Sequence, residues 1–326
     1  MSASAVPLWK QVLRQNFTDF TKLADFLELS ELQRQAMVAR PRFTLNLPMR
    51  LAKKIAKGTL DDPLLKQFLP SILENSIDSS FVADPVGDQL CRKSSKLIHK
   101  YQGRALLVCT SACAMHCRYC FRQHFDYNIT NKIFEEELLL IAADTSINEV
   151  ILSGGDPLSL DNKILSELLQ SLASIPHIRK VRFHTRFPIG IPERIDTPFL
   201  DMLKSVPLQF WFVIHCNHAN ELDADIFSAL KSIQKLGIPV LNMSVLLKDV
   251  NDSVEALKEL CTALVDHGVF PYYLNQLDRV QGAAHFEVPE ARGIEIMQKL
   301  ATELPGYGLP RYIKEISGKT GKTIIV

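Results

Sequence analysis

Short runs of β-branched and aromatic residues alternate with amphipathic stretches from about residue 105 onward. The runs predict strands and the stretches predict the helices between them. The strands are expected at residues 105–109, 149–153, 180–185, 208–215, 240–246 and 269–275, and the helices at 132–143, 161–174, 198–205, 224–236 and 254–267. Successive βα units predict an α/β fold with a parallel sheet, and six units predict a partial (β/α)6 barrel instead of a complete eight-stranded one.

The residues before this pattern have a mostly helical character. Apolar side chains recur at helical spacing over 8–26, and residues 48–57 and 63–69 predict two shorter helices. We therefore expect three regions. They are a mainly helical N-terminal extension over 1–98, the barrel over 99–285, and a C-terminal helix, strand and lysine-containing segment over 286–326.

Composition narrows the classes of function. The 326 residues contain 37 Lys and Arg against 36 Asp and Glu, and a net charge of +1 provides no long-range field for nucleic acid or an acidic membrane. The longest apolar stretch, 208–215, is far shorter than the ~20 residues of a membrane helix. Residues 1–20 lack the order of a signal peptide, and seven cysteines is an odd number. These features predict a cytoplasmic protein with reduced thiols and a small-molecule substrate.

A dense cysteine array carries the strongest chemical signal. Cys113, Cys117 and Cys120 form CxxxCxxC just after the first predicted strand. Structural zinc normally takes four ligands in two separated pairs, and a closed iron-sulfur cluster normally takes four cysteines. Three thiolates thus predict a [4Fe-4S] cluster with one open iron, with zinc as the alternative and Cys109 as a spare ligand. With Tyr119 before the last cysteine, the array resembles the CxxxCxΦC motif of radical S-adenosylmethionine (SAM) enzymes, where Φ is aromatic.

Polar residues follow several of the predicted strands. Ser153, Gly154, Gly155 and Asp156 end the second strand, where two glycines let the backbone approach a ligand closely. A tight turn is the alternative, but beside a three-cysteine site the segment resembles the one with which radical SAM enzymes hold the methionyl amino group. The ends of other strands carry Cys113, Thr185, Arg186, His215 and residues 275–278. In such folds the chemistry sits at the C-terminal ends of the strands, so these residues predict one active site.

The C-terminal segment contains two candidate lysines. Lys319 and Lys322 lie in Gly318-Lys-Thr-Gly-Lys-Thr323, after a strand-like run at 312–316. The segment lacks the GxxxxGK[ST] spacing and the following helix of a phosphate loop, which excludes a nucleotide site. Two interpretations remain. One is a solvated basic tail, and the other is a lysine whose amine binds the aldehyde of pyridoxal phosphate, with flexible glycines to give it reach.

From about residue 43 onward the chain resembles lysine 2,3-aminomutases, which combine radical SAM chemistry with pyridoxal phosphate. The matching motifs are His99-Lys-Tyr-Gln-Gly-Arg104, Cys113-Ala-Met-His-Cys-Arg-Tyr-Cys-Phe-Arg122, Leu152-Ser-Gly-Gly-Asp-Pro-Leu158, His215-Cys-Asn-His-Ala-Asn-Glu221, Ser244-Val-Leu-Leu-Lys-Asp-Val-Asn-Asp252 and Gln281-Gly-Ala-Ala-His-Phe286. The second and last of these are similar to the short bacterial branch that makes (R)-β-lysine for modification of elongation factor P.

The resemblance implies roles for particular residues. Lys322, with Lys319 as the alternative, would bind pyridoxal phosphate, and Arg104 would hold its phosphate group. Arg122 would hold the substrate carboxylate and Asp278 its distal ammonium, with Glu315 in place of a second Asp. Lys322, Arg122 and Asp278 are the expected catalytic residues. The expected SAM site is Ser153, Gly154, Gly155, Asp156, Arg186 and His215, and the expected cluster ligands are Cys113, Cys117 and Cys120. Met243 stands where the family usually has Gln, so a side-chain amide near the phosphate is absent or replaced.

The implied function is conversion of L-α-lysine to β-lysine, as the R enantiomer, by a SAM-derived 5'-deoxyadenosyl radical and a pyridoxal phosphate imine. The implied partners are a reductant such as flavodoxin or ferredoxin and, linked through the product, elongation factor P and its ligase. Assembly as a homo-oligomer is left open. The alternatives are a radical SAM aminomutase acting on another amino acid, such as glutamate or arginine, and a non-catalytic iron-sulfur or zinc protein.

Overall fold

A nine-stranded sheet forms the centre of the computed structural model, which describes residues 6–38, 41–127 and 132–326. The strands pair in sequence order, with β2 to β8 parallel and with β1 and β9 antiparallel at the two edges. They are β1 (Leu97–Tyr101), β2 (Arg104–Thr110), β3 (Glu149–Gly154), β4 (Lys180–Thr185), β5 (Gln209–His215), β6 (Val240–Val245), β7 (Phe270–Asn275), β8 (Arg311–Lys314) and β9 (Thr323–Ile324). Because β1 and β9 do not pair, the sheet is an open, partial barrel.

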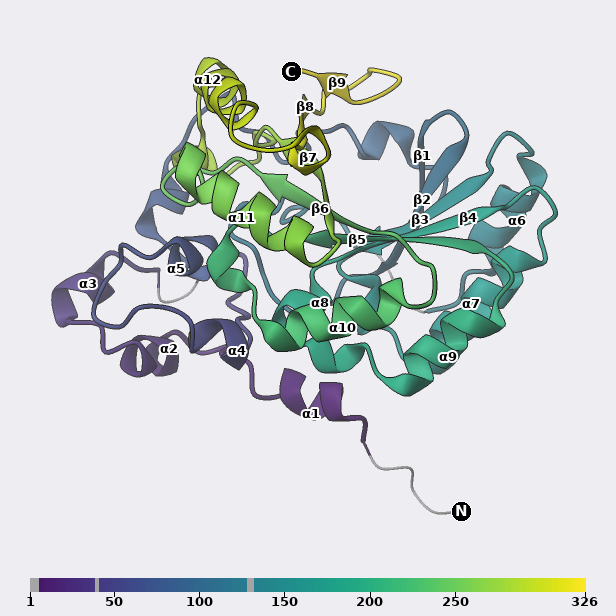
Figure 1. Cartoon of the computed structure of the whole chain (residues 1–326), viewed down its shortest axis with the longest axis horizontal. Coiled ribbons are helices and arrows are strands. Elements are labelled where there is room, and N and C mark those ends of the chain that lie inside the picture. The colour runs from purple at the N-terminus through teal and green to yellow at the C-terminus, as the bar shows by residue number, and fades with distance from the viewer. Residues whose placement is uncertain (1–5, 39–40, 128–131) are drawn as a thin grey trace.

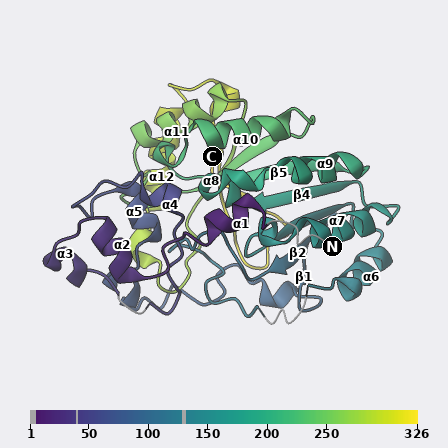
Figure 2. The same ribbon diagram turned by 90° about the horizontal axis from the view of Figure 1, so that it is seen from below.

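Helices cover the outer side of the sheet, and the N-terminal helices from Phe20 to Phe68 gather at one end of it, while the first helix, Leu8–Leu13, lies against the outer helices (Figures 1 and 2). Those of the N-terminal region are α1 (Leu8–Leu13), α2 (Phe20–Phe26), α3 (Glu31–Gln35), α4 (Met49–Ala52) and α5 (Pro63–Phe68). The others are α6 (Glu135–Ala143), α7 (Asn162–Ala173), α8 (Phe187–Gly190), α9 (Thr197–Ser205), α10 (Ala224–Gln234), α11 (Val254–Asp266) and α12 (Glu290–Leu300). In the described ranges no helix is long and apolar enough to cross a membrane.

The two faces of the sheet have different chemistry. In β4, Val181 and Phe183 are fully buried and belong to the main hydrophobic core, and the Phe183 ring lies 6.3 Å from that of Phe199 on α9. The alternate residues Arg182 and His184 line a cavity on the inner side. Because side chains alternate along a strand, an apolar outer face and a polar inner face follow from one period-two pattern. The apolar face packs on helices, while the polar face is left for a ligand.

The predicted partial barrel and its six strands are confirmed, each strand to within about one or two residues at either end. The strand-like run at 312–316 forms β8, which pairs with β7 and so adds a seventh parallel strand to the six expected in the barrel. Two helices are shorter than predicted: the one at 132–143 begins at Glu135, and the one at 48–57 spans only Met49–Ala52.

The single helix predicted over 8–26 is wrong, because the chain forms two helices there. Phe17 exchanges backbone hydrogen bonds with Leu47, at 2.8 and 3.0 Å, which interrupts the helix. The Asp19 carboxylate then accepts a hydrogen bond from the Lys22 N–H and caps a new helix, α2. A tertiary contact and a cap thus override a continuous apolar pattern.

Candidate active site

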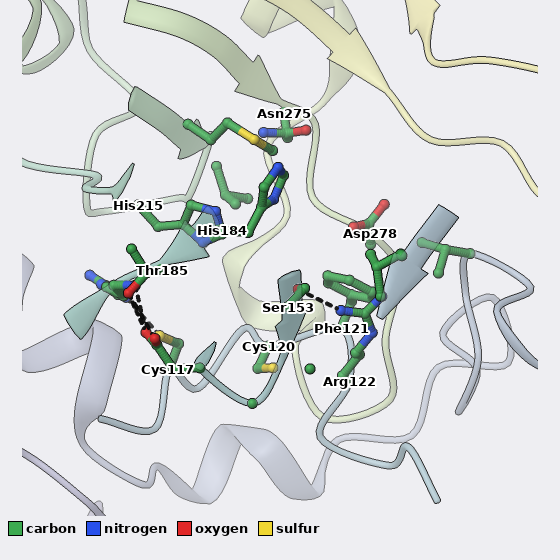
Figure 3. Close-up of a pocket in the computed structure, with 18 of the residues that line it drawn as sticks. Cys117, Cys120, Phe121, Arg122, Ser153, His184, Thr185, His215, Asn275 and Asp278 are labelled. Carbon is green, nitrogen blue, oxygen red and sulfur yellow. Dashed lines mark hydrogen bonds between the residues drawn. The ribbon is translucent and has the colours of Figure 1, made fainter. Parts of the chain in front are cut away.

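A cavity of about 700 Å³ lies on the inner side of the sheet. Figure 3 shows its lining, with Cys117 and Cys120 at one end, and Asn275 and Asp278 away from them. The lining includes the three clustered cysteines and Arg104, Arg122, Ser153, Gly154, Gly155, Asp156, Arg186, His215, Asp278, Glu315 and Lys322. The structure therefore brings all the predicted site residues to a single cavity, as expected for side chains near the ends of neighbouring parallel strands.

The N-terminal region holds the cysteine loop in place. The His116 N–H donates to the Asn46 carbonyl at 2.9 Å, the Asn46 side-chain amide donates to the Cys113 carbonyl at 3.1 Å, and the Arg118 N–H donates to the Gln67 carbonyl at 2.9 Å. These bonds fix a loop that has no regular secondary structure of its own. The extension is thus part of the site as well as a cover for the barrel.

The thiols suit a cluster better than a single ion. Across the described ranges, no three Cys, His, Asp or Glu side chains lie close enough to hold one metal ion. Cysteine thiolates in a [4Fe-4S] cluster bind different irons, so they surround the cluster without meeting at a point. Burial raises the pKa of Cys120 to about 11 and that of Cys113 well above its usual value, so iron binding must release their protons.

The glycines at the end of β3 are required by the cysteine loop. Gly154 has a φ of +115°, and a Cβ at Gly155 would lie 2.4 Å from the Ala112 carbonyl oxygen. This neighbour is backbone and cannot move aside as a side chain could. The Gly-Gly pair therefore lets the loop pass against the end of β3, which is a further reason for these glycines besides close approach to a ligand.

Asp156 joins the ends of two strands. Its carboxylate accepts hydrogen bonds from the Thr185 hydroxyl at 2.7 Å and from the N–H groups of Leu158, Arg186 and Phe187 at 2.8–3.0 Å. Burial raises its pKa to about 6, while these hydrogen bonds oppose the rise. Because its oxygens are occupied by protein donors, Asp156 shapes the site through the backbone of β3 and β4.

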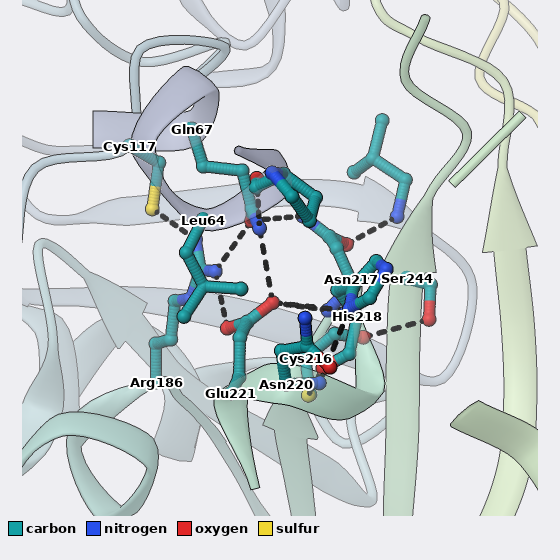
Figure 4. Close-up of polar contacts among 12 residues, drawn as sticks. Leu64, Gln67, Cys117, Arg186, Cys216, Asn217, His218, Asn220, Glu221 and Ser244 are labelled. Carbon is teal, nitrogen blue, oxygen red and sulfur yellow. Dashed lines mark hydrogen bonds and ion pairs between the residues drawn. The ribbon is translucent and has the colours of Figure 1, made fainter. Parts of the chain in front are cut away.

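Arg186 crosses from β4 to the cysteine loop through a buried network (Figure 4). Its guanidinium donates to Glu221 at 2.6 Å, to the Gln67 side chain at 2.7 Å and to Cys117 Sγ at 2.7 Å. The other Glu221 oxygen accepts from the backbone N–H groups of Asn217 and His218 at 2.9 and 3.0 Å. One carboxylate therefore balances the arginine and orders the loop after β5.

Replacing Glu221 with alanine is expected to lower the free energy of unfolding by about 3–5 kcal/mol, because it leaves a buried guanidinium without its charge partner. Glu221 is fully buried and Arg186 nearly so. Urea denaturation followed by circular dichroism measures the change. Glu303→Ala is the control, since its ion pair with Lys258 is exposed to solvent and its loss should change the free energy of unfolding far less. Equal costs for the two variants would contradict the importance of the buried network.

A second arginine, Arg122, lies next to the end of β3. Its Nε and one terminal nitrogen donate to Asp88 at 2.9 and 2.8 Å, and the other terminal nitrogen donates to the Ser153 hydroxyl at 3.2 Å. Both Arg122 and Asp88 are buried. Asp88 comes from the N-terminal region, so that region also sets the direction of this guanidinium.

Lys322 enters the cavity from the C-terminal segment, whereas Lys319 is exposed and outside it. The Lys322 ammonium donates to the Asn275 side-chain oxygen at 3.2 Å and lies 3.7 Å from Glu315. The Arg104 guanidinium stacks 4.7 Å from the centre of the Tyr101 ring. The amine and the guanidinium open onto one cavity. The amine is suited to react with the aldehyde of pyridoxal phosphate, and the guanidinium is suited to bind its phosphate group.

Two histidines on neighbouring strands have imidazole nitrogens without partners. Among the described residues, neither His184 Nε2 nor His215 Nε2 has a hydrogen-bond partner, and the two rings meet edge to face at 5.6 Å. Burial lowers the pKa of His215 to about 3, so this imidazole is neutral. A buried polar atom without a partner is costly, and a bound ligand would satisfy it.

Comparison with known proteins places these observations in a family. A family model described as a 4Fe-4S single cluster domain matches residues 102–183. The L-lysine 2,3-aminomutase of Escherichia coli (strain K12) is 41% identical over 320 residues, which cover 97% of this chain and 93% of that protein. This chain belongs to the L-lysine 2,3-aminomutase family. An aminomutase is an isomerase, so the chain is an enzyme of that class.

Another family member and a solved structure are also similar to this chain. The family member from Haemophilus influenzae is 38% identical and is matched over 97% of this chain and 95% of its own length. Among solved structures, Streptococcus suis SuiB bound to S-adenosylmethionine has a TM-score of 0.49 at 14% identity, covering 66% of this chain and 51% of that one.

Several residues of this aminomutase-family site were missed by the sequence analysis. They are Gln67, Asp88, Lys100, Tyr101, His184, Asn217 and Glu221, none of which was assigned a role, although Lys100, Tyr101, Asn217 and Glu221 lie within the motifs of the family resemblance. Asn275 was expected at the site as a strand-end residue, without a role of its own. Gln67 and Asp88 precede the barrel and have no local motif. Alternation in β4 could have indicated His184, because it shares the inner face with Arg182.

Proposed function

We propose that this protein converts L-lysine to (R)-β-lysine with a [4Fe-4S] cluster, SAM and pyridoxal phosphate. The observation that carries the proposal is the cavity itself, which gathers three thiols, the Lys322 amine, the Arg122 guanidinium and the Asp278 carboxylate. The reaction moves the amino group from C2 to C3 and a hydrogen atom from C3 to C2. Substrate and product therefore have the same composition, as an isomerase requires.

The cofactors would supply radical hydrogen abstraction and a π-system conjugated to the migrating nitrogen. Cys113, Cys117 and Cys120 would hold the cluster. Ser153, Gly154, Gly155 and the free Nε2 of His215 would contact SAM, while Asp156 and Arg186 fix the loops around it. Lys322 would bind pyridoxal phosphate through its amine, and Arg104 would hold the phosphate.

The substrate would be held at its two ends. Arg122 would bind the α-carboxylate, in an orientation set by Asp88 and Ser153. Asp278 would receive the distal ammonium, because its carboxylate opens onto the cavity and makes no hydrogen bond or ion pair with any described residue. A negative charge at this end favours a substrate with a distal cation, such as lysine or arginine, over glutamate.

The decisive experiment is turnover under anaerobic conditions. The protein would be reconstituted with iron, sulfide and pyridoxal phosphate, reduced, and given SAM and L-lysine. We expect β-lysine, with the R form resolved by chiral chromatography. Failure to form β-lysine with an intact cluster would reject the substrate assignment, and the S enantiomer would reject the stereochemical one.

Lysine use is expected to depend on the charge of Asp278. Burial raises the pKa of Asp278 to about 7, so below that pH the free enzyme carries a neutral acid that cannot attract an ammonium group. kcat/KM for lysine should therefore rise as the pH increases through about 7, since this ratio reports groups of the free enzyme. The profile of Asp278→Asn should lack this rise. An unchanged inflection in that variant would assign it to another group.

The wider role follows from the product. We propose that β-lysine passes to a ligase that attaches it to elongation factor P, without a stable complex with this protein. A reductant such as flavodoxin or ferredoxin would supply the electron, in the cytoplasm. The test is cellular: deletion of the gene should leave elongation factor P without its β-lysyl group, and added (R)-β-lysine should restore it.

A further inference from the structure

Glu315, just after β8, is already occupied by protein groups. Its Oε1 accepts a hydrogen bond from the Lys100 ammonium at 2.6 Å and another from the Tyr101 hydroxyl. The Lys100 side chain is 9% exposed and that of Glu315 is 12% exposed, so the pair is shielded from water. Lys100 also donates to the Val86 carbonyl. Glu315 thus belongs to a closed cluster anchored on β1.

Asp278 has the opposite environment. It lines the same cavity, yet its carboxylate has no hydrogen bond or ion pair with any residue in the ranges 6–38, 41–127 and 132–326. The neighbouring charges of Lys322 and Lys100 are felt only at longer range. A cationic ligand could therefore pair with the carboxylate of Asp278, whereas the carboxylate of Glu315 is already paired with Lys100.

The remaining oxygen of Glu315 faces Lys322. Glu315 Oε2 lies 3.7 Å from the Lys322 ammonium, which also donates to the Asn275 side chain at 3.2 Å. Lys322 sits in a glycine-containing segment, and its ammonium also lies over the Tyr273 ring, 5.5 Å from the ring centre. Among the described residues, Glu315 and Asn275 are therefore the two side chains that make polar contacts with this amine inside the cavity.

We infer that Glu315 is a positioning residue for Lys322, and that Asp278 alone recognises the distal ammonium of the substrate. This inference rests on the proposed function and refines it, because the resemblance implied that both carboxylates bind the substrate. A second ammonium group at Glu315 would have to compete with Lys100 at Oε1 or with Lys322 at Oε2, and so would separate an ion pair that the structure already contains. Removing one member of a buried ion pair is strongly unfavourable, so the substrate is expected to leave this cluster intact.

The test compares two ligands and two carboxylates. L-2-Aminohexanoate has the carbon chain of lysine without the distal ammonium. Binding of each ligand to the holoenzyme, with cluster and pyridoxal phosphate but no SAM, would be measured by calorimetry. The preference for lysine should fall by at least about 30-fold in Asp278→Asn, the effect of losing a buried charge pair. In Glu315→Gln the preference should stay within about threefold of the unsubstituted protein.

Glu315→Gln should instead change the state of Lys322. Without either ligand, the fraction of pyridoxal phosphate trapped on Lys322 by borohydride should fall by at least about threefold, because a partly shielded charge no longer draws the amine inward. Glu315→Asp keeps the charge and should recover most of the trapping. Glu290→Gln is the matched control, since Glu290 pairs with Lys314 of β8 outside the cavity, at 2.6 Å.

The outcomes separate the two claims. A fall in lysine preference in Glu315→Gln equal to that in Asp278→Asn would overturn the inference, as would unchanged trapping. If Glu315→Gln does not fold, Asp278→Asn decides: the inference requires this variant to lose most of its preference for lysine, and a preference that largely remains would overturn it. Neither measurement needs turnover, so a failure to make β-lysine would reject the proposed function without deciding the role of Glu315.

Discussion

Replacing Cys117 with alanine is expected to reduce β-lysine formation by roughly 1,000-fold or more, which corresponds to at least about 4 kcal/mol of lost transition-state stabilisation. The loop offers three thiols, and each would bind a separate iron of the cluster. Of the other four cysteines, Cys109, Cys216 and Cys261 are buried in the fold and Cys91 does not line the cavity. The structure thus holds no obvious replacement ligand among the described residues.

Iron analysis, the visible spectrum of the cluster and chiral chromatography of the product would be measured together. Cys91→Ala is the matched control, because Cys91 is half-buried away from the cavity and should keep both cluster and activity. Loss of the cluster with retained activity would reject the radical mechanism. An intact cluster with lost activity would indicate a different fault, because Cys117 also accepts a hydrogen bond from Arg186.

The features that could be predicted from the sequence are those that depend on residues close together in the chain. β4 could be predicted from its own six residues, because alternation of apolar and polar side chains sets both its conformation and its two faces. The cysteine loop could be predicted because its three candidate ligands lie within eight residues. The site of Lys322 needed the family resemblance, since exposed lysines are common.

The residues that were missed depend on distant partners. Glu221 meets Gln67, and Arg122 meets Asp88, across separations of 154 and 34 residues. No local pattern marks Gln67 or Asp88, and their importance appears only when the N-terminal region packs against the mouth of the barrel. Glu315 was predicted as a site residue. Its ion pair with Lys100 was not predicted, because Lys100 lies 215 residues away in the chain.

Through these long-range contacts the N-terminal region helps to position the side chains of the candidate active site. It supplies Asp88 to orient one predicted substrate-binding group, Arg122, and it supplies Gln67 to the network of the other arginine, Arg186. It also anchors the cysteine loop through Asn46. Without this region the barrel would lose the partners that fix these charged side chains, and it would also lose part of its main hydrophobic core. Mutations that disturb the packing of the N-terminal region are therefore expected to change the geometry of the site as well.

Replacing Lys322 with alanine is expected to abolish covalent attachment of pyridoxal phosphate and to lower β-lysine formation by roughly 1,000-fold or more. Lys322 is the lysine of the C-terminal segment that lines the cavity. Its ammonium makes one hydrogen bond to Asn275 and an ion pair with Glu315 and lies 5.5 Å from the centre of the Tyr273 ring, and its side chain is 27% exposed. Truncation should therefore leave the fold intact, so that a loss of activity reports chemistry.

Borohydride reduction followed by peptide mass mapping would locate the attachment, and Lys319→Ala is the matched control. Lys319 lies three residues earlier in the same segment but is exposed and outside the cavity. It should keep both the attachment and the activity. Labelling of Lys319 in the unsubstituted protein would reverse the assignment, since an amine in solvent would then have to swing past Gly321 to reach the site. The cavity position of Lys322 favours the opposite result, because its amine already lies beside Asn275 and Glu315 without any such movement.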